Sequence, residues 1–147
     1  MMIRHVVITG VATASLAFAF TPAVGAPTQG SHAPAAQAPD GLLHAWTDAG
    51  GRGHHCTWGG PSDNWGTCRN AASDIWNNGT AVTLDAVDLY WGTSGTGAHA
   101  CISRGDSWNN LPVDIHKFTY GQGLGGFGES VNDNISSHRW VDYCSQG

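Results

Sequence analysis

Short runs in which apolar and polar residues alternate dominate the chain from residue 42 onwards. Leu42–Thr47 and His54–Trp58 flank a glycine-rich turn, and Val87–Trp91 and His99–Ser103 flank a second one. Clusters of Gly, Asn, Asp and Ser separate the runs, and no stretch keeps the 3.6-residue apolar period of a helix. The pattern therefore predicts an all-β domain with many turns.

Four further segments complete the predicted outline. The Asn-Gly pair inside Trp76–Thr80 predicts a tight turn. Ala81–Leu84 is predicted to close the first half of the domain, and Ile115–Tyr120 is predicted to be another strand. Gly121–Gly128 contains five glycines, which indicates either a mobile loop or a place where two backbones approach closely.

Two polar segments indicate an internal repeat. Asn132–Ser137, here called the second polar loop, precedes Trp140, and Arg69–Asp74, the first polar loop, precedes Trp76. Each loop ends a unit with the order strand, glycine turn, strand with cysteine, loop, polar loop and tryptophan. We place the units at about residues 42–85 and 87–144. Four strands per unit, arranged as Greek keys, would pack face to face as a sandwich.

The beginning of the chain is typical of a secreted protein. Met1–Ala26 has a basic start, an apolar run and a small-residue cleavage pattern, which predict a signal peptide rather than a membrane anchor. Pro27–Gly41 is rich in Ala and Pro and is predicted to be a disordered leader. The remaining residues, 42–147, are enough for one small domain, which we expect to be monomeric.

Four cysteines lie in the predicted domain, and after secretion an even number indicates disulfides. Three pairings are possible. The two-unit organisation favours one bridge within each unit, Cys56–Cys68 and Cys101–Cys144. Zinc is the competing interpretation, but the sequence contains no Cys-x-x-Cys pair.

Charge narrows the range of partners. Cleavage after Ala26 would remove Arg4 and leave five Lys/Arg against eleven Asp/Glu, a net charge of −6 with histidine neutral. This balance disfavours nucleic acid and, once the signal is removed, a membrane as partners. It is compatible with calcium binding.

The chain resembles a βγ-crystallin-type domain, and in particular the small secreted bacterial proteins of peptidase inhibitor family I36. The resemblance covers about Leu42 to Cys144. It is carried by Cys68–Ser73, Trp76–Gly79, Val87–Tyr90 and Gly126–Trp140. It implies two Greek-key motifs forming a βγ-crystallin-like sandwich.

The resemblance also implies a calcium site. The second polar loop fits the βγ-crystallin signature of two Asn/Asp, two free residues, Ser/Thr and Ser. The candidate ligands are Asn132, Asp133, Asn134 and Ser137. Asp133 is the only carboxylate among them, so we expect weak binding, with a dissociation constant on the order of 10⁻⁵ to 10⁻³ M. The alternative is that the polar side chains only cap the loop through backbone hydrogen bonds.

The first polar loop departs from this signature at both ends. Arg69 stands in place of the first Asn/Asp, and Asp74 in place of the final Ser. A guanidinium would repel a cation, whereas Asp74 would either act as a ligand or pair with Arg69. We therefore expect at most one calcium site.

Family I36 is named for inhibitors of secreted metalloproteases, so the resemblance implies a secreted peptidase as partner. An inhibitor needs a rigid exposed loop. The segment between Cys56 and Cys68, with Pro61 and Trp65, is the leading candidate, and Trp108 lies in another loop. The Gly121–Gly128 loop is predicted to be too flexible.

Other functions are less well supported. The sequence has no Gly-x-Ser-x-Gly, His-Glu-x-x-His or phosphate-binding Gly-Lys-Ser/Thr motif, so we expect no enzyme. His54 and His55 are adjacent on a strand and would point to opposite faces, which disfavours a metal pair. Glu129 and Asp133 are a weak candidate for paired acids.

Tryptophans suggest the runner-up function, a carbohydrate- or cell-wall-binding module or an antimicrobial protein. Trp58, Trp65 and Trp108 lie in or near loops and are predicted to be exposed. The other four are predicted to be in the core: Trp46, Trp76, Trp91 and Trp140.

Overall fold

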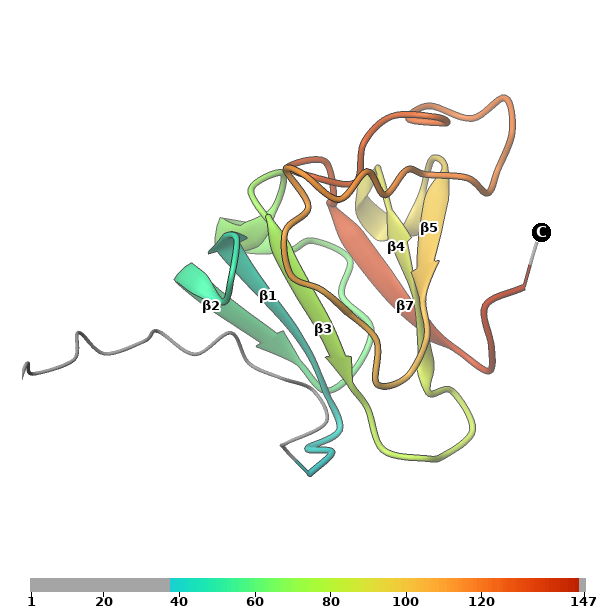
Figure 1. Cartoon of the computed structure of the whole chain (residues 1–147). Coiled ribbons are helices and arrows are strands. Elements are labelled where there is room, and N and C mark those ends of the chain that lie inside the picture. Colours follow the sequence, from blue (N-terminus) through green and yellow to red (C-terminus); the bar gives the residue numbers. More distant parts are fainter. Residues whose placement is uncertain (1–37, 146–147) are drawn as a thin grey trace, which may run out of the picture.

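The computed structural model describes residues 38–145, which form two antiparallel sheets (Figure 1). The first sheet has the strand order β2 (Arg52–Trp58), β1 (Leu42–Asp48), β3 (Asp74–Asn78) and β6 (Ser107–Trp108). The second has the order β5 (His99–Ile102), β4 (Ala86–Tyr90) and β7 (Ser137–Val141). Two 3₁₀ turns, η2 (Gly66–Cys68) and η3 (Thr93–Gly95), complete the elements. The predicted signal peptide and residues 27–37 lie outside the described residues.

Each unit forms most of one sheet and adds a short segment to the edge of the other unit's sheet. In each unit a hairpin, β1–β2 or β4–β5, is followed by a strand that returns beside its first member, β3 or β7. The short strand β6 of the second unit pairs with β3 of the first. Reciprocally, Ser62 of the first unit bridges His138 on β7. This order confirms the predicted fold class, an all-β sandwich of two Greek-key units.

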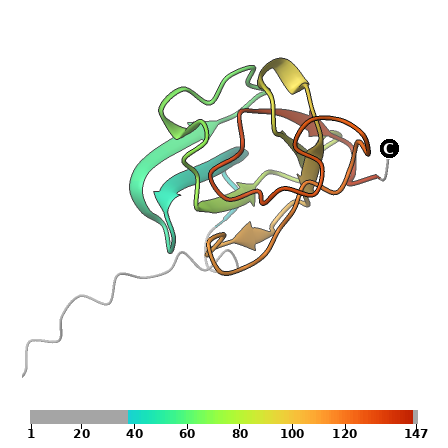
Figure 2. The ribbon, with the colours of Figure 1, turned by 90° about the horizontal axis from the view of Figure 1, so that it is seen from above.

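The core lies between the facing sides of the two sheets, which are seen from above in Figure 2. Alternation along the strands decides which residues enter it. The fully buried side chains that line it from β1, β3, β4 and β5 are Leu43, Ala45, Ile75, Val87, Leu89 and Ile102. Burial of this apolar surface holds the two units together. Within residues 38–145, no helix has the length and apolar character needed to cross a membrane.

The predicted tight turn at Trp76–Thr80 is wrong, because the first three residues of that segment belong to β3, and every residue of β3 is buried. The Asn-Gly pair misled the prediction. Asn77 is tolerated inside a central strand because its side-chain amide is fully hydrogen-bonded. The amide nitrogen donates to Asp85 O (2.9 Å) and Ile102 O (3.2 Å), and its oxygen accepts from the Gly79 N–H (3.0 Å).

Two further segments of the predicted outline, Ala81–Leu84 at the end of the first unit and the predicted strand Ile115–Tyr120, form no strand in the described part of the chain. In Ala81–Leu84, Val82 and Leu84 are 60% and 50% exposed, so this segment places no apolar residue in the core. Ile115–Tyr120 makes only isolated bridges, Lys117 with Ser130 and Tyr120 with His99. Both segments contain residues that favour strands. Neither lies beside a partner strand with which it could form a continuous ladder of backbone hydrogen bonds.

Each unit contains one disulfide that connects its elements, which is the pairing that the two-unit organisation favoured. Cys56 on β2 is joined to Cys68 on η2, with Cα atoms 6.4 Å apart. Cys101 on β5 is joined to Cys144, beyond β7, at 5.5 Å. No free cysteine remains among the described residues. The sulfur atoms therefore do not form the zinc site that was the competing interpretation.

Candidate functional site

The two polar loops lie side by side and exchange backbone hydrogen bonds. The Asn70 N–H donates to Ile135 O (2.9 Å), and the Asp133 N–H donates to Ala72 O (3.1 Å). In both cases the donor is the second residue of one loop and the acceptor is the fourth residue of the other. The loops are therefore related by a local two-fold pseudosymmetry, although their sequences match imperfectly.

The backbone conformation at the second position explains why that position favours Asn or Asp. Asn70 and Asp133 have φ angles of +52° and +57°. This left-handed region is unfavourable for most side chains, and Asn and Asp are the non-glycine residues that tolerate it best. The first polar loop therefore keeps the fold of the second.

The last residue of each polar loop fastens the hairpin turn of its own unit. Ser137 is fully buried; its Oγ accepts from the Gly95 N–H (2.9 Å) and donates to Gly92 O (2.6 Å). In the first unit, Asp74 Oδ2 accepts from the Gly51 N–H (2.6 Å). Asp74 thus takes over the position and the acceptor role of Ser137. The structure places Ser137 at the β4–β5 turn, where its hydroxyl is hydrogen-bonded to Gly92 and Gly95.

The pseudosymmetry instead creates two equivalent pairs of oxygen-bearing side chains. Each pair takes one side chain from each polar loop. Ser73 Oγ lies 3.4 Å from Asp133 Oδ1, and Ser136 Oγ lies 3.0 Å from Asn70 Oδ1. Each pair joins the fifth residue of one loop to the second residue of the other. Ser73 was not predicted as a partner of Asp133. The signal that identifies it is its equivalence to Ser136 in the repeat.

Charge distinguishes the two pairs. Arg69 Nε donates to Ser136 Oγ at 3.3 Å, so a guanidinium stands at the Asn70–Ser136 pair, which has no carboxylate. That pair borders a surface hollow of about 300 Å³ that Arg69 also lines. The Asp133–Ser73 pair contains a carboxylate instead. Electrostatic attraction therefore favours a cation at Asp133 and disfavours one beside Arg69.

Asn132 and Asn134 have different roles in the second polar loop. Asn134 Nδ2 donates to the carbonyls of Ser130 (3.0 Å) and Asn132 (3.1 Å), which holds the loop in shape. Asn132 Nδ2 donates to Asp133 Oδ2 at 2.7 Å. Asn132 Oδ1 is buried and has no hydrogen-bond partner within residues 38–145. The carboxylate of Asp133, the hydroxyl of Ser73 and the unsatisfied amide oxygen of Asn132 are all hard oxygen donors, the kind that calcium binds.

The candidate interaction residues are not all at the surface. Pro61 is exposed, but Trp65 is only 2% exposed, and its Nε1 donates to His138 Nδ1 at 2.8 Å. Trp108 is half-buried and stacks on His116, with ring centroids 4.1 Å apart. The expected exposure of Trp65 is therefore wrong, because docking of the two units buries this loop residue against β7.

Trp91 departs from its prediction in the opposite direction. Predicted to be in the core, it is 39% exposed and covers the backbone at Gly126, where an added Cβ would lie 2.2 Å from Trp91 Cγ. Its Nε1 donates to Glu129 Oε2 at 3.0 Å. Glu129 is thus committed to Trp91, which does not support pairing it with Asp133 as catalytic acids.

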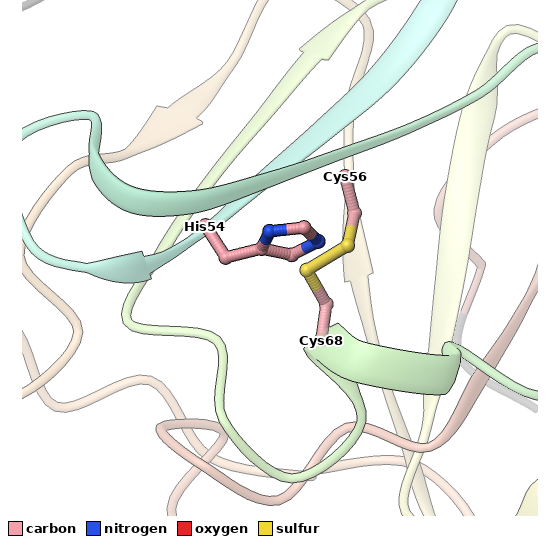
Figure 3. A group of neighbouring side chains, drawn as sticks. All are labelled: His54, Cys56 and Cys68. Atoms are coloured by element: carbon pink, nitrogen blue, oxygen red, sulfur yellow. A yellow bond between two sulfur atoms is a disulfide. The ribbon is translucent and has the colours of Figure 1, made fainter.

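His54 lies beside the Cys56–Cys68 disulfide, as Figure 3 shows, and its ring nitrogen and the two sulfur atoms lie within 4.8 Å of one another. Both sulfur atoms are bonded to each other. Cysteine binds zinc as the thiolate, and these two sulfur atoms are oxidised to a disulfide, so the group offers zinc only the imidazole of His54.

Comparison with known proteins gives similarity of fold. No protein-family model matches the sequence, and no curated relative matches it. A βγ-crystallin from Ciona intestinalis is 13% identical over 68% of this chain and 99% of its own, with a TM-score of 0.47. A βγ-crystallin from an archaeon is 12% identical over 68% of this chain and 96% of its own, with a TM-score of 0.48.

IPSE/alpha-1 from Schistosoma mansoni eggs is 13% identical, over 67% of this chain and 81% of its own, with a TM-score of 0.43. Because all three TM-scores are below 0.5, the fold described above rests on strand order and on the reciprocal contacts of the polar loops. None of these comparisons bears on membership of inhibitor family I36, which stays a prediction.

Proposed function

We propose that this protein is a secreted, non-enzymatic binding domain that is stabilised by one calcium ion at Asp133. The observation that carries the proposal is the approach of Asp133 Oδ1 to Ser73 Oγ, which come from different units. An ion held by both would strengthen the junction between the units. Asn132 supplies a further oxygen in the same loop, and calcium, which takes six to eight oxygens, would complete its shell with carbonyls and water.

A single carboxylate implies modest affinity, suited to extracellular calcium. Binding only to the folded state would stabilise the domain by about 2.7 kcal/mol at about 100 times the dissociation constant. For a domain of this size, that corresponds to a rise in Tm of about 10 °C or more.

We therefore expect the wild-type protein to bind one calcium ion and Asp133→Ala to bind none, because the only carboxylate of the site is removed. Arg69→Asn combined with Asn70→Asp should bind two, because it removes the guanidinium from Ser136 and gives the first polar loop a carboxylate at the position equivalent to Asp133. Isothermal titration gives the stoichiometry, and melting in calcium against EDTA gives the stabilisation. Asp106→Ala removes an exposed carboxylate elsewhere and should behave as wild type.

If about 10 mM calcium does not raise the Tm of the wild-type protein, the proposal is wrong. Equal stabilisation of wild type and Asp133→Ala would place the ion elsewhere. If the Arg69→Asn/Asn70→Asp variant folds but still binds one ion, the guanidinium and the missing carboxylate are not what prevents binding at the second position.

Peptidase inhibition is a second candidate, favoured by the rigidity of the Gly59–Thr67 segment. The Cys56–Cys68 disulfide closes its base, and Ser62 exchanges two backbone hydrogen bonds with His138. Trp65 fixes its centre in the core. Pro61, Asp63 and Asn64 remain exposed between these anchors. A loop ordered before binding loses little conformational entropy in a protease cleft.

On this proposal, near-stoichiometric protein should inhibit at least one secreted metalloprotease, and Asn64→Glu should weaken inhibition at least tenfold. A charge at the loop tip would have to be desolvated in the cleft. Leu124→Glu places the same charge on another exposed loop and should leave inhibition unchanged. Retention on cell-wall polysaccharide without inhibition of any protease tested would favour the carbohydrate-binding alternative.

A further inference from the structure

Two histidines from neighbouring strands meet on the first sheet. His44 on β1 and His55 on β2 place Nδ1 and Nε2 3.0 Å apart, with their rings nearly parallel at 11°. His44 is 7% exposed, whereas His55 is at the surface. Two imidazole nitrogens at this separation are close enough to bind one metal ion.

The strand register creates this pair. His55 is opposite Trp46, and His44 is opposite Thr57, so the two histidines are diagonal neighbours on one face of the sheet. His54 points to the other face, towards the disulfide (Figure 3). The adjacent pair His54–His55 is therefore divided, as expected from the alternation of a strand, and His55 acquires a partner 11 residues away.

Asp40 determines the tautomer of His44, so that the nitrogen facing His55, Nδ1, carries no proton. Asp40 Oδ2 lies 2.9 Å from His44 Nε2, and Asp40 Oδ1 accepts from the Leu42 N–H at 2.9 Å. The carboxylate is thereby held in place and favours a proton on Nε2. His44 Nδ1 then presents its lone pair, and His55 donates its Nε2 proton to it. Carboxylates orient the histidine ligands of zinc in this way.

Aromatic rings support both imidazoles. Trp46 stacks on His55 with centroids 4.3 Å apart and planes within 1°. His44 stacks against Trp46 and Trp76 at 5.7 and 5.2 Å. The rings are therefore oriented before any ion arrives, which lowers the entropy lost on binding.

We propose that His44 Nδ1 and His55 Nε2 bind a divalent transition cation of the zinc class, with Asp40 orienting His44. Zinc binds imidazole nitrogen at about 2.0–2.1 Å, which sets tetrahedral ligands about 3.3 Å apart. The nitrogens would separate slightly, which needs only a small shift of the exposed His55 ring in its own plane, parallel to Trp46. Its proton moves from Nε2 to Nδ1, so the site forms from two neutral imidazoles, and water fills the remaining positions. This site is independent of calcium at Asp133.

The test is isothermal titration of zinc chloride into untagged protein with both disulfides intact. Wild type should bind one equivalent, and His55→Ala should lose that binding. Because His55 is exposed, this variant should fold, which its circular dichroism verifies. Asp40→Asn should weaken binding by about tenfold or more, as expected for a residue that orients a ligand.

Two matched variants complete the experiment. His54→Ala removes the neighbouring histidine on the opposite face, and Asp133→Ala removes the calcium carboxylate; both should bind zinc as wild type does. Absence of wild-type binding at about 1 mM zinc, or unchanged binding in His55→Ala, would overturn the proposal. Loss of binding in His54→Ala with retention in His55→Ala would move the site to the disulfide face.

Discussion

Replacing Cys101 and Cys144 together by serine should lower the free energy of unfolding by about 4 kcal/mol, because this disulfide closes a long loop in the unfolded chain. The two residues are separated by 43 positions. The bridge also ties β5, an edge of the second sheet, to the segment that follows β7. Small domains bury little apolar surface, so a loss of this size is a large part of their stability.

The other disulfide provides the comparison. Cys56 and Cys68 are separated by 12 positions, and the same loop-closure relation gives about 3 kcal/mol for their replacement by serine. Urea denaturation of the two double variants measures the difference directly. If removal of Cys56–Cys68 destabilises the domain more, native-state contacts of the short loop outweigh unfolded-state entropy.

The second large effect is acid destabilisation through His138. This side chain is fully buried, and burial lowers the pKa of His138 to about 4, with a smaller contribution from the positive charge of Arg139. A hydrogen bond between Nε2 and Gly60 O (2.8 Å) acts in the opposite direction. Nδ1 accepts from Trp65 Nε1, so a proton added there would face another donor.

The sign follows from where the proton binds. The pKa of His138 is about 4 in the folded state and about 6.5 in the unfolded state, so the unfolded chain binds more protons between these values. The contribution to stability is complete above pH 6.5, falls as the pH drops through this interval, and levels off below pH 4. The total loss is about 3 kcal/mol.

Urea denaturation at several pH values between 7.5 and 4 measures this loss. His138→Gln is the matched variant, since glutamine can accept from Trp65 and donate to Gly60 O without titrating. It should lose less stability on acidification than wild type, by about 3 kcal/mol. Burial also lowers the pKa of the half-buried His116, so His116→Gln controls for a second histidine. Equal acid sensitivity of wild type and His138→Gln would contradict the prediction.

Alternation along the chain was enough to locate the strands that form the two hairpins. Val87 and Leu89 are fully buried, whereas Asp88 between them is not, and β4 was predicted within one residue. The pattern failed where tertiary contacts overrode local preference. Asn77 lies in a central strand because the carbonyls of Asp85 and Ile102, 8 and 25 positions further along the chain, accept hydrogen bonds from its amide.

The exposure of the tryptophans likewise depends on tertiary contacts that the local sequence pattern does not reveal. Trp65 lies in a loop between two disulfide-bonded cysteines, and nothing local indicates that His138, 73 positions later, accepts a hydrogen bond from it. Trp91 follows a buried strand, but its ring covers glycine backbone from a distant loop at the surface. Burial of a loop residue depends on what packs over it, and local composition does not contain that information.

The sequence by itself determined the all-β class, the two repeated units, the favoured disulfide pairing and the position of the second polar loop. Each depends on local alternation, on the repeat or on cysteine positions. Only the tertiary structure decided which side chains meet. The Asp133–Ser73 pair joins residues 60 positions apart, and the His44–His55 pair requires the register between two strands. Docking of the units and strand pairing set such contacts, because they bring together segments that have no fixed spacing along the chain.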